Sequence, residues 1–366
     1  MTGAMMTPDV RRNWEAIRGE LPEDYESLAL ETKAIKPQYA NVQITKADDL
    51  LRMIFLHVGA NLPLRQTVAW FAETGGPKVS AYCLHTRMRA AGGYLSALVA
   101  RMTTWRSQCV PELWDGYSLM LVDATSFSGR VATGTDARIH AVLRLADLGV
   151  VQATALGVEH GETLRHFQWD ERQLVIGDRA YCNPPGIAWA VDRGADVLVR
   201  LNRSALPLLD RRGESFDVLR WVRSLREGQT VVRAVRFVVK GDGKPRSIDG
   251  RVIATRLPED KAEEARARVR KEQGRDATAE TLEMAAYVVL FTTANLAAER
   301  CLEAYRLRWQ IELLFKRWKS ICGFDALPNE RPDTIRSWLA AKLLLGLIVE
   351  RIAARADGVN TPPCAE

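Results

Sequence analysis

Cysteine and histidine are scarce in this chain, and their spacing excludes several kinds of structural site. The six cysteines fall at positions 83, 109, 182, 301, 322 and 364. They include no CxxC pair, and no histidine stands at a spacing that would complete a zinc site. Scattered cysteines of this kind are typical of reduced thiols in a cytosolic protein. The sequence therefore predicts a fold without structural zinc or disulfides.

Long hydrophobic runs are also lacking. The N-terminal segment, MTGAMMTPDVRRNWEAIRGE, has no apolar stretch of signal-peptide type. The apolar segment AAKLLLGLIVERIAAR, near the C-terminus, is too short to span a bilayer. We expect this segment to form a buried core helix, and we expect no membrane partner.

The excess of positive charge is small but unevenly distributed. The 366 residues include 51 Lys and Arg against 45 Asp and Glu, a net charge of +6. This length allows two or three globular domains of about 150 residues. Residues 200–275 carry 20 Lys and Arg against 11 Asp and Glu, so the remainder is slightly negative. The basic segment is a candidate nucleic-acid surface, although an arginine-rich solvated surface explains it equally well.

Helical periodicity dominates residues 1–110. KADDLLRMIFLHVGA and LPLRQTVAWFAETGG have apolar residues at helical spacing, and Ser80 is placed to cap a further helix. A short glycine-containing turn joined to a basic second helix is also the pattern of a helix-turn-helix. A plain helical bundle explains it at least as well. We expect an all-helical N-terminal region that serves in DNA binding or dimerisation.

From residue 117 the pattern changes to an α/β order. Five segments read as strands: YSLMLVDATSF, two within IHAVLRLADLGVVQATALGVE, RQLVIGDRAY and DVLVRL. A helix at NPPGIAWAVDRGA separates the last two. This order predicts a core with a mixed five-stranded sheet and helices, whose first part is 115–201 and whose C-terminal part is 294–355.

Residues 202–293 interrupt that order. Strand-like alternation occurs in QTVVRAVRFVV, RSIDGRVIATRL and AAYVVLFTT, and EDKAEEARARVRKEQG reads as a charged, solvent-facing helix. We therefore expect a β-rich, basic insertion inside the α/β domain. A tail at 356–366 follows the core.

Two of the predicted strands end in aspartate. Asp123 follows LMLV and Asp178 follows LVIG. Ligand sites in α/β sheets gather beyond the carboxyl ends of strands, so neighbouring strands would bring these carboxylates together. Close anions repel, and magnesium or manganese is the natural counterion for hard oxygen ligands. Either aspartate alone is better explained as the start of a turn.

A third acid lies in the basic segment YRLRWQIELLFKRWKS, residues 305–320, which reads as one helix. At 100° per residue, Tyr305, Arg308, Glu312 and Lys319 fall within a sector of about 60°, opposite an apolar packing face. Arg308 and Glu312 are also i,i+4 neighbours, a pair that decorates many helices. Joined to the two strand-end aspartates, however, Glu312 would complete a site for two metal ions roughly 4 Å apart.

These motifs resemble those of a known family. DATSF, with Asp123, and GDRAY, with Asp178, resemble the first-Asp and second-Asp motifs of bacterial DDE transposases of the insertion-sequence-4 type, the cut-and-paste family related to the Tn-five transposase. YRLRWQIELLFKRWK matches the family signature Tyr-x2-Arg-x3-Glu-x6-Lys at every position. The resemblance covers about residues 117–350.

The resemblance implies a ribonuclease-H-like catalytic core interrupted by the insertion. Asp123, Asp178 and Glu312 would bind two Mg²⁺ ions, for which Mn²⁺ could substitute. The residues expected to contact DNA are Tyr305, Arg308, Lys319, Lys316, Arg179 and Tyr181. Relatives flip a base onto a tryptophan near the strand that precedes the glutamate helix. This chain has none there, which leaves Tyr287 or Trp221 for that role.

The expected activity is therefore cleavage at transposon ends and joining of the 3′-hydroxyls to target DNA. The implied partners are double-stranded DNA, as terminal inverted repeats and target, and a second copy of the chain in a synaptic dimer. The implied location is the bacterial cytoplasm, at the nucleoid. Two alternatives stay open: an inactive, domesticated DNA-binding relative, and a ribonuclease-H-like nuclease that uses only water.

Overall fold

The structure is a computed structural model that describes residues 10–36, 43–107, 113–127, 137–157, 159–240, 245–274, 277–324, 327 and 332–356. Nearly all of the predicted tail lies outside these residues, as do Cys109 and Cys364. The described cysteines are all free thiols, as the sequence predicts.

The N-terminal part of the chain is helical. Its helices are α1 (Val10–Arg18), α2 (Tyr25–Glu31), α3 (Ala47–Gly59), α4 (Leu64–Glu73), α5 (Ala81–Ala90) and α6 (Gly92–Ser107). Ser80 caps α5 as predicted, since its hydroxyl accepts a hydrogen bond of 3.0 Å from the backbone N–H of Cys83. The α4–turn–α5 segment packs on α3, so the described helices form a small bundle.

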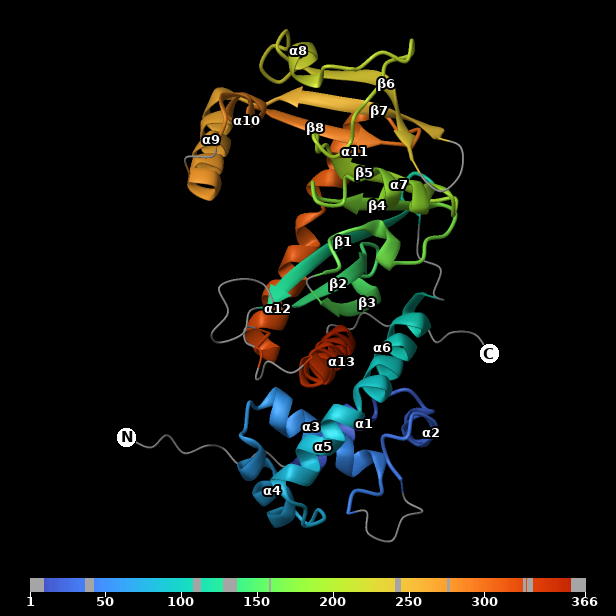
Figure 1. The fold of residues 1–366 in the computed structure, drawn as a ribbon, viewed down its shortest axis with the longest axis vertical. Coiled ribbons are helices and arrows are strands. Elements are labelled where there is room, and N and C mark those ends of the chain that lie inside the picture. The colour runs from blue at the N-terminus through green and yellow to red at the C-terminus, as the bar shows by residue number, and fades with distance from the viewer. Residues whose placement is uncertain are drawn as a thin grey trace.

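The strands form a single mixed sheet of eight strands within the described residues, in the order β3-β2-β1-β4-β5-β8-β7-β6 (Figure 1). The β1, β4 and β5 strands are mutually parallel, and the other pairs are antiparallel. Their bounds are β1 (Ser118–Phe127), β2 (Ala137–Arg144), β3 (Gly149–Gly157), β4 (Gln173–Gly177), β5 (Asp196–Arg200), β6 (Thr230–Val239), β7 (Arg246–Arg256) and β8 (Tyr287–Thr292).

The predicted five-stranded sheet is therefore too small. The first five strands occur as expected, but β8 pairs with β5 on one side and with β7 on the other. The strands of the predicted insertion thus continue the same sheet. The physical reason is that β5 would otherwise be an edge strand, whose unpaired N–H and C=O groups favour a further strand.

Helices cover both faces of the sheet. Those beyond the N-terminal region are η1 (Leu164–His166), α7 (Pro184–Val191), α8 (Val218–Val222), α9 (Glu259–Gln273), α10 (Ala279–Met284), α11 (Ala298–Arg306), α12 (Trp309–Cys322) and α13 (Pro332–Ala356). One apolar core joins the first face to α12, α13 and the N-terminal helices, and a second core lies on the other face.

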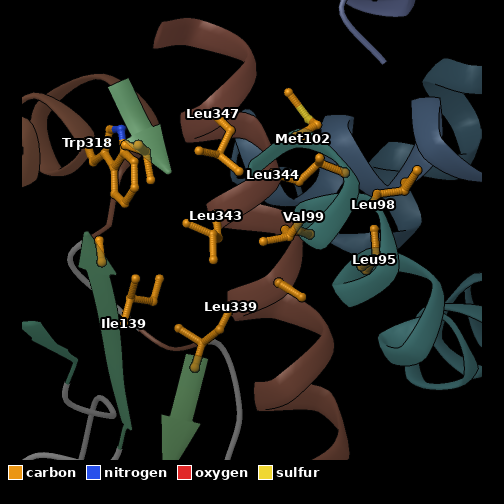
Figure 2. Close-up of a cluster of buried hydrophobic side chains, with 14 of the residues drawn as sticks. Leu95, Leu98, Val99, Met102, Ile139, Trp318, Leu339, Leu343, Leu344 and Leu347 are labelled. Carbon is orange, nitrogen blue, oxygen red and sulfur yellow. The ribbon is translucent and has the colours of Figure 1, made fainter. Parts of the chain in front are cut away.

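The α13 helix lies between the N-terminal helices and the sheet (Figure 1). Figure 2 shows Leu339, Leu343 and Leu347 of α13 between side chains of α6 and the sheet strand that carries Ile139. The sequence prediction of a buried core helix is confirmed, because these leucines are almost wholly buried. No helix in the described part of the chain is long and apolar enough to cross a membrane.

The predicted single helix over 305–320 is interrupted. The α11 helix ends at Arg306 and α12 begins at Trp309, with a tightened turn between them. In this turn the N–H of Arg308 bonds to the carbonyl of Tyr305 at 3.1 Å, three residues earlier, as in a 3₁₀ helix. Tyr305 therefore belongs to α11, and Arg308 precedes α12, which carries Glu312.

Candidate active site

The site begins as a row of charged residues at the carboxyl ends of three parallel strands. Leu121 of β1 pairs with Ile176 of β4, so Asp123 stands opposite Asp178 two residues further on. By the same count, from Gly177 paired with Val199, Asp178 stands opposite Arg200 of β5. Neighbouring strands lie about 4.8 Å apart, and side chains alternate between faces. The three charged residues therefore share one face of the sheet, the face that α12 and α13 cover.

Asp123 is a partly buried carboxylate beside another acid. Its side chain is 18% exposed, and its Oδ1 accepts a 2.8 Å hydrogen bond from the N–H of Ala124. Burial, with a smaller contribution from Asp178, raises its pKa to about 7, although the Ala124 N–H and Arg308 act in the opposite direction. The ionised pair is therefore poorly compensated and would gain from a nearby cation.

The turn after β4 holds Asp178 at the sheet edge. Its Oδ1 accepts a 2.8 Å hydrogen bond from the N–H of Ala180. A Cβ on Gly177 would lie 3.0 Å from Cβ of Tyr181 and 3.1 Å from a methyl group of Val122. Only glycine fits without displacing these neighbours, so the small residue before Asp178 keeps this turn tight against β1.

Glu312 comes to the site from α12 and is held by Arg308. The Arg308 guanidinium donates from Nη2 to Glu312 Oε1 at 2.5 Å, and its Nη1 lies 3.8 Å from Asp123 Oδ2. Arg308 thus connects the first aspartate to the glutamate. The predicted acids are therefore gathered in one region, with one guanidinium between two of them.

The donor chemistry of this region fits a hard divalent cation. Asp123, Asp178 and Glu312 offer only carboxylate oxygens, the ligands that Mg²⁺ and Mn²⁺ prefer. As arranged, however, no three His, Cys, Asp or Glu side chains among the described residues are grouped closely enough to hold a metal ion. The ion pair with Arg308 accounts for this, because it engages the Glu312 carboxylate.

Tyr305 reaches the same region from α11. Its ring centroid lies 5.9 Å from the Arg308 guanidinium carbon. Burial raises the pKa of its phenol, while Arg308 and Arg200 lower it. The described helix thus places a phenol over the row formed by Asp178 and Arg200.

The other predicted DNA contacts divide into exposed and buried residues. Lys316 and Lys319 are exposed on α12, and Arg179 is exposed directly after Asp178. Tyr181, in contrast, is fully buried, and its hydroxyl lies 3.5 Å from Nδ1 of His140. Its predicted contact with DNA is not available in this structure, because the ring packs beneath the turn that carries Asp178.

Neither aromatic residue predicted to stack a flipped base is presented at the site. Tyr287 is only 6% exposed and packs in the second core. Trp221 lies on α8, beside β6 at the far end of the sheet (Figure 1), and packs on Phe216 with ring centroids 5.4 Å apart. Strand and helix patterns fixed the elements of these residues but not the burial of their rings.

The sequence interpretation missed two residues near the site. Arg200 ends DVLV as the aspartates end their own strands, so the same signal marked its place. Glu162 lies in an irregular segment before η1, where no pattern identified it. Burial, and then Asp178, raise the pKa of Glu162, while Arg138 lowers it. A fourth carboxylate therefore adds to the negative charge around Asp178.

Comparison with known proteins agrees with this geometry. The family model described as a transposase DDE domain matches residues 114–347. The chain is 30% identical over 352 residues to the putative transposase InsL of insertion sequence element IS186A from Escherichia coli K12, covering 93% of this chain and 94% of that protein. It is also 30% identical to the transposase of insertion sequence element IS421 from Escherichia coli, over 353 residues and with the same coverage.

A solved structure of the piggyBac transposase synaptic complex with hairpin DNA aligns with 95% of this chain and 76% of that chain. The TM-score is 0.44 and the sequence identity is 10%, so nothing below depends on this likeness.

Proposed function

Because the chain belongs to the transposase DDE domain family and is an enzyme of that class, we propose that it carries out cut-and-paste transposition. It cleaves DNA at the ends of its own element and joins the released 3′-hydroxyls to target DNA. The observation that carries the proposal is the meeting of Asp123, Asp178 and Glu312 at one sheet edge, with Arg308 between two of them.

The strand order supports a ribonuclease-H-like core. The first five strands occupy adjacent positions as β3-β2-β1-β4-β5, with β2 antiparallel to its neighbours and β1, β4 and β5 parallel. This is the mixed five-stranded unit that we expected from the sequence. The two aspartates come from its central strands, β1 and β4.

Asp123, Asp178 and Glu312 are the residues that would hold the divalent ions. Bound there, two such ions activate an attacking hydroxyl and stabilise the leaving oxygen at phosphorus. Arg308 neutralises Asp123 and Glu312 in the described arrangement. It is therefore placed to exchange its carboxylate partner for a DNA phosphate, which guanidinium groups bind well.

Exposed cations around the acids would bind the DNA backbone. Lys316, Lys319 and Arg179 are exposed, and none has an acidic partner among the described residues. Tyr305 and Arg308 would contact the strand nearest the acids. We further propose that residues 1–110 bind the inverted repeats or mediate synaptic dimerisation.

Single carboxylate-to-amide substitutions test the proposal. Asp123→Asn, Asp178→Asn and Glu312→Gln should each reduce magnesium-dependent cleavage of DNA carrying the element ends by roughly a thousandfold or more, because each removes a charged oxygen ligand. Binding to the same DNA, measured by gel shift, should survive. Glu303→Gln, an exposed acid on α11, is the matched control and should cleave normally.

Cleavage that persists in all three variants would overturn the assignment. Binding by the wild-type chain with no nicking in Mg²⁺ or Mn²⁺ would favour a DNA-binding relic. Hydrolysis without joining to a target duplex would favour a plain nuclease.

A further inference from the structure

A cavity of about 380 Å³ opens beside the catalytic row and has no role in the account above. Its walls come from the residues that follow β4 and β5 and from the facing sides of α9 and α10. One wall therefore belongs to the strands that carry the acids, and the other to the segment 202–293. The cavity is a place where the two parts of the chain can hold one ligand together.

Arginine dominates the charge of this cavity. Arg179, Arg200, Arg203 and Arg268 line it, against the single acid Glu272. Only Arg203 has an ion pair among the described residues, at 3.3 Å from Glu280 outside the lining. Three guanidinium groups therefore face a shared space without a fixed anion.

Arg200 shows what this concentration of charge costs. Burial lowers the pKa of its guanidinium, and Arg179, Arg308 and Arg268 lower it further by repulsion. Cations kept together in this way are stabilised when an anion enters between them. Polar groups of Asn202 and Ser204 at the lining suit a phosphate, which accepts hydrogen bonds as well as charge.

The cavity continues the catalytic row. Asp178 stands opposite Arg200 on the neighbouring strand, and Arg179 directly follows Asp178. A strand of DNA with one phosphate at the acids therefore meets the cavity about one strand spacing away, roughly 5 Å. No second surface with this charge needs to be reached.

We propose that this arginine cavity is a phosphate subsite for a single DNA strand leaving the catalytic acids, closed on its outer side by α9. The inference rests on the proposed function and extends it, because it assigns the segment 202–293 a direct part in holding the strand. The chemical class of the ligand is the phosphodiester backbone, independent of base sequence.

The test measures binding of a fluorescent short oligothymidylate across a salt titration, by anisotropy. Arg268→Ala should weaken binding roughly fivefold and reduce the slope of log affinity against log salt by about 0.7, the value for one phosphate contact on single-stranded DNA. Glu272→Gln removes the only acid of the lining and should tighten binding about threefold. A gain of this kind cannot come from misfolding.

Matched controls lie on the same helix. Arg270→Ala removes an arginine that lies outside the lining and pairs with Glu263 at 2.8 Å. Glu264→Gln removes an exposed acid that pairs with Lys261. Both should leave affinity and salt slope unchanged.

Equal effects of Arg268→Ala and Arg270→Ala, or no effect of either, would overturn the subsite. That result would leave the transposase assignment intact, because the assignment is tested separately by cleavage in the carboxylate variants. Thymidine monophosphate should compete poorly at equal phosphate concentration. Competition as strong as that of the oligonucleotide would overturn the strand subsite and assign the cavity to free nucleotides.

Discussion

At the scale of single residues, the structure buries a histidine on the reverse face of the sheet from the catalytic row. His140 of β2 is fully buried, with its ring 4.8 Å from that of His166 and the Tyr181 hydroxyl at 3.5 Å from Nδ1. Burial lowers its pKa to about 3, and His166, Arg138 and His160 add smaller repulsions. The folded protein therefore keeps this ring neutral at pH values where an unfolded histidine is protonated.

The pH dependence of stability follows from this difference. Between the unfolded pKa near 6.5 and the folded value near 3, only the unfolded chain binds the proton, so acid favours unfolding. The contribution is present above about pH 6.5 and falls by roughly 1.4 kcal/mol for each pH unit below it. Urea unfolding at neutral pH and one to two units lower should show a smaller loss in His140→Gln than in the wild type.

Two features keep this measurement interpretable. Asp123 has a raised pKa in the folded protein, so its contribution has the opposite sign and is lost as pH rises towards 7. Comparing variant with wild type at each pH cancels that contribution. His160→Gln changes a half-exposed ring and should keep the wild-type slope. The same slope in all three proteins would contradict the assigned pKa of His140.

At the scale of elements, the crossing of α12 and α13 positions Glu312. The fully buried indole of Trp318 on α12 packs over Gly346 of α13. A Cβ at Gly346 would lie 3.0 Å from Cε2 of this ring. The glycine therefore permits a close approach, and it sets how deeply α12 sits against the sheet.

Gly346→Ala should destabilise the protein even though alanine favours helix. The gain in helix propensity is about 1 kcal/mol, whereas overpacking a rigid buried ring costs about 1–3 kcal/mol. We expect a lower melting temperature and reduced cleavage, because the displaced helix carries Glu312. Gly93→Ala on α6 adds a Cβ with nothing within 4 Å and should leave both unchanged or slightly improved. A more stable Gly346→Ala protein would show that the crossing can relax.

How much of this arrangement the sequence predicted depends on the range of the interaction. Apolar runs ending in Asp123 and Asp178 identified two central strands and their acids, because strand patterns and turns are local. The turn at Leu307–Arg308 was missed because the apolar spacing continues through it. The joining of β8 to β5 was missed because pairing between residues some ninety positions apart leaves no local pattern.

The buried side of the site was equally hidden from the sequence. Tyr181 and Tyr287 carry the residue type that binds DNA bases, yet both rings are buried. Arg200 gave the same signal as the aspartates, a charge that ends an apolar run, but its sign concealed its place in the row. Register, which only the sheet pairing supplies, shows that it stands beside Asp178.

At the scale of the whole molecule, α13 makes the N-terminal helices and the sheet one cooperative body. Leu343 lies at the centre of the shared core (Figure 2). Further along α13, Arg351 and Arg355 pair with the buried Glu20, which lies between α1 and α2. The connection is thus apolar along the helix and ionic near its end.

Leu343→Ala should cost about 2–5 kcal/mol, the range for truncating a buried leucine. Because both sides share this core, far-UV circular dichroism and tryptophan fluorescence should report a single urea transition that moves as one. Ile352→Ala changes a residue of α13 that is 39% exposed and should shift the transition little. Two separated transitions in the Leu343 variant would show that the N-terminal helices fold independently.

The position of α13 also sets a timetable for the newly made chain. The α6 helix ends at Ser107, and the ribosome must continue to Pro332 before α13 begins. At ordinary bacterial rates of synthesis this interval lasts on the order of ten to forty seconds. Throughout it, Leu95, Leu98 and Met102 lack the surface on which they finally pack. The enzyme is therefore completed from its C-terminal side, and the N-terminal helices reach their final packing only after most of the chain has been translated.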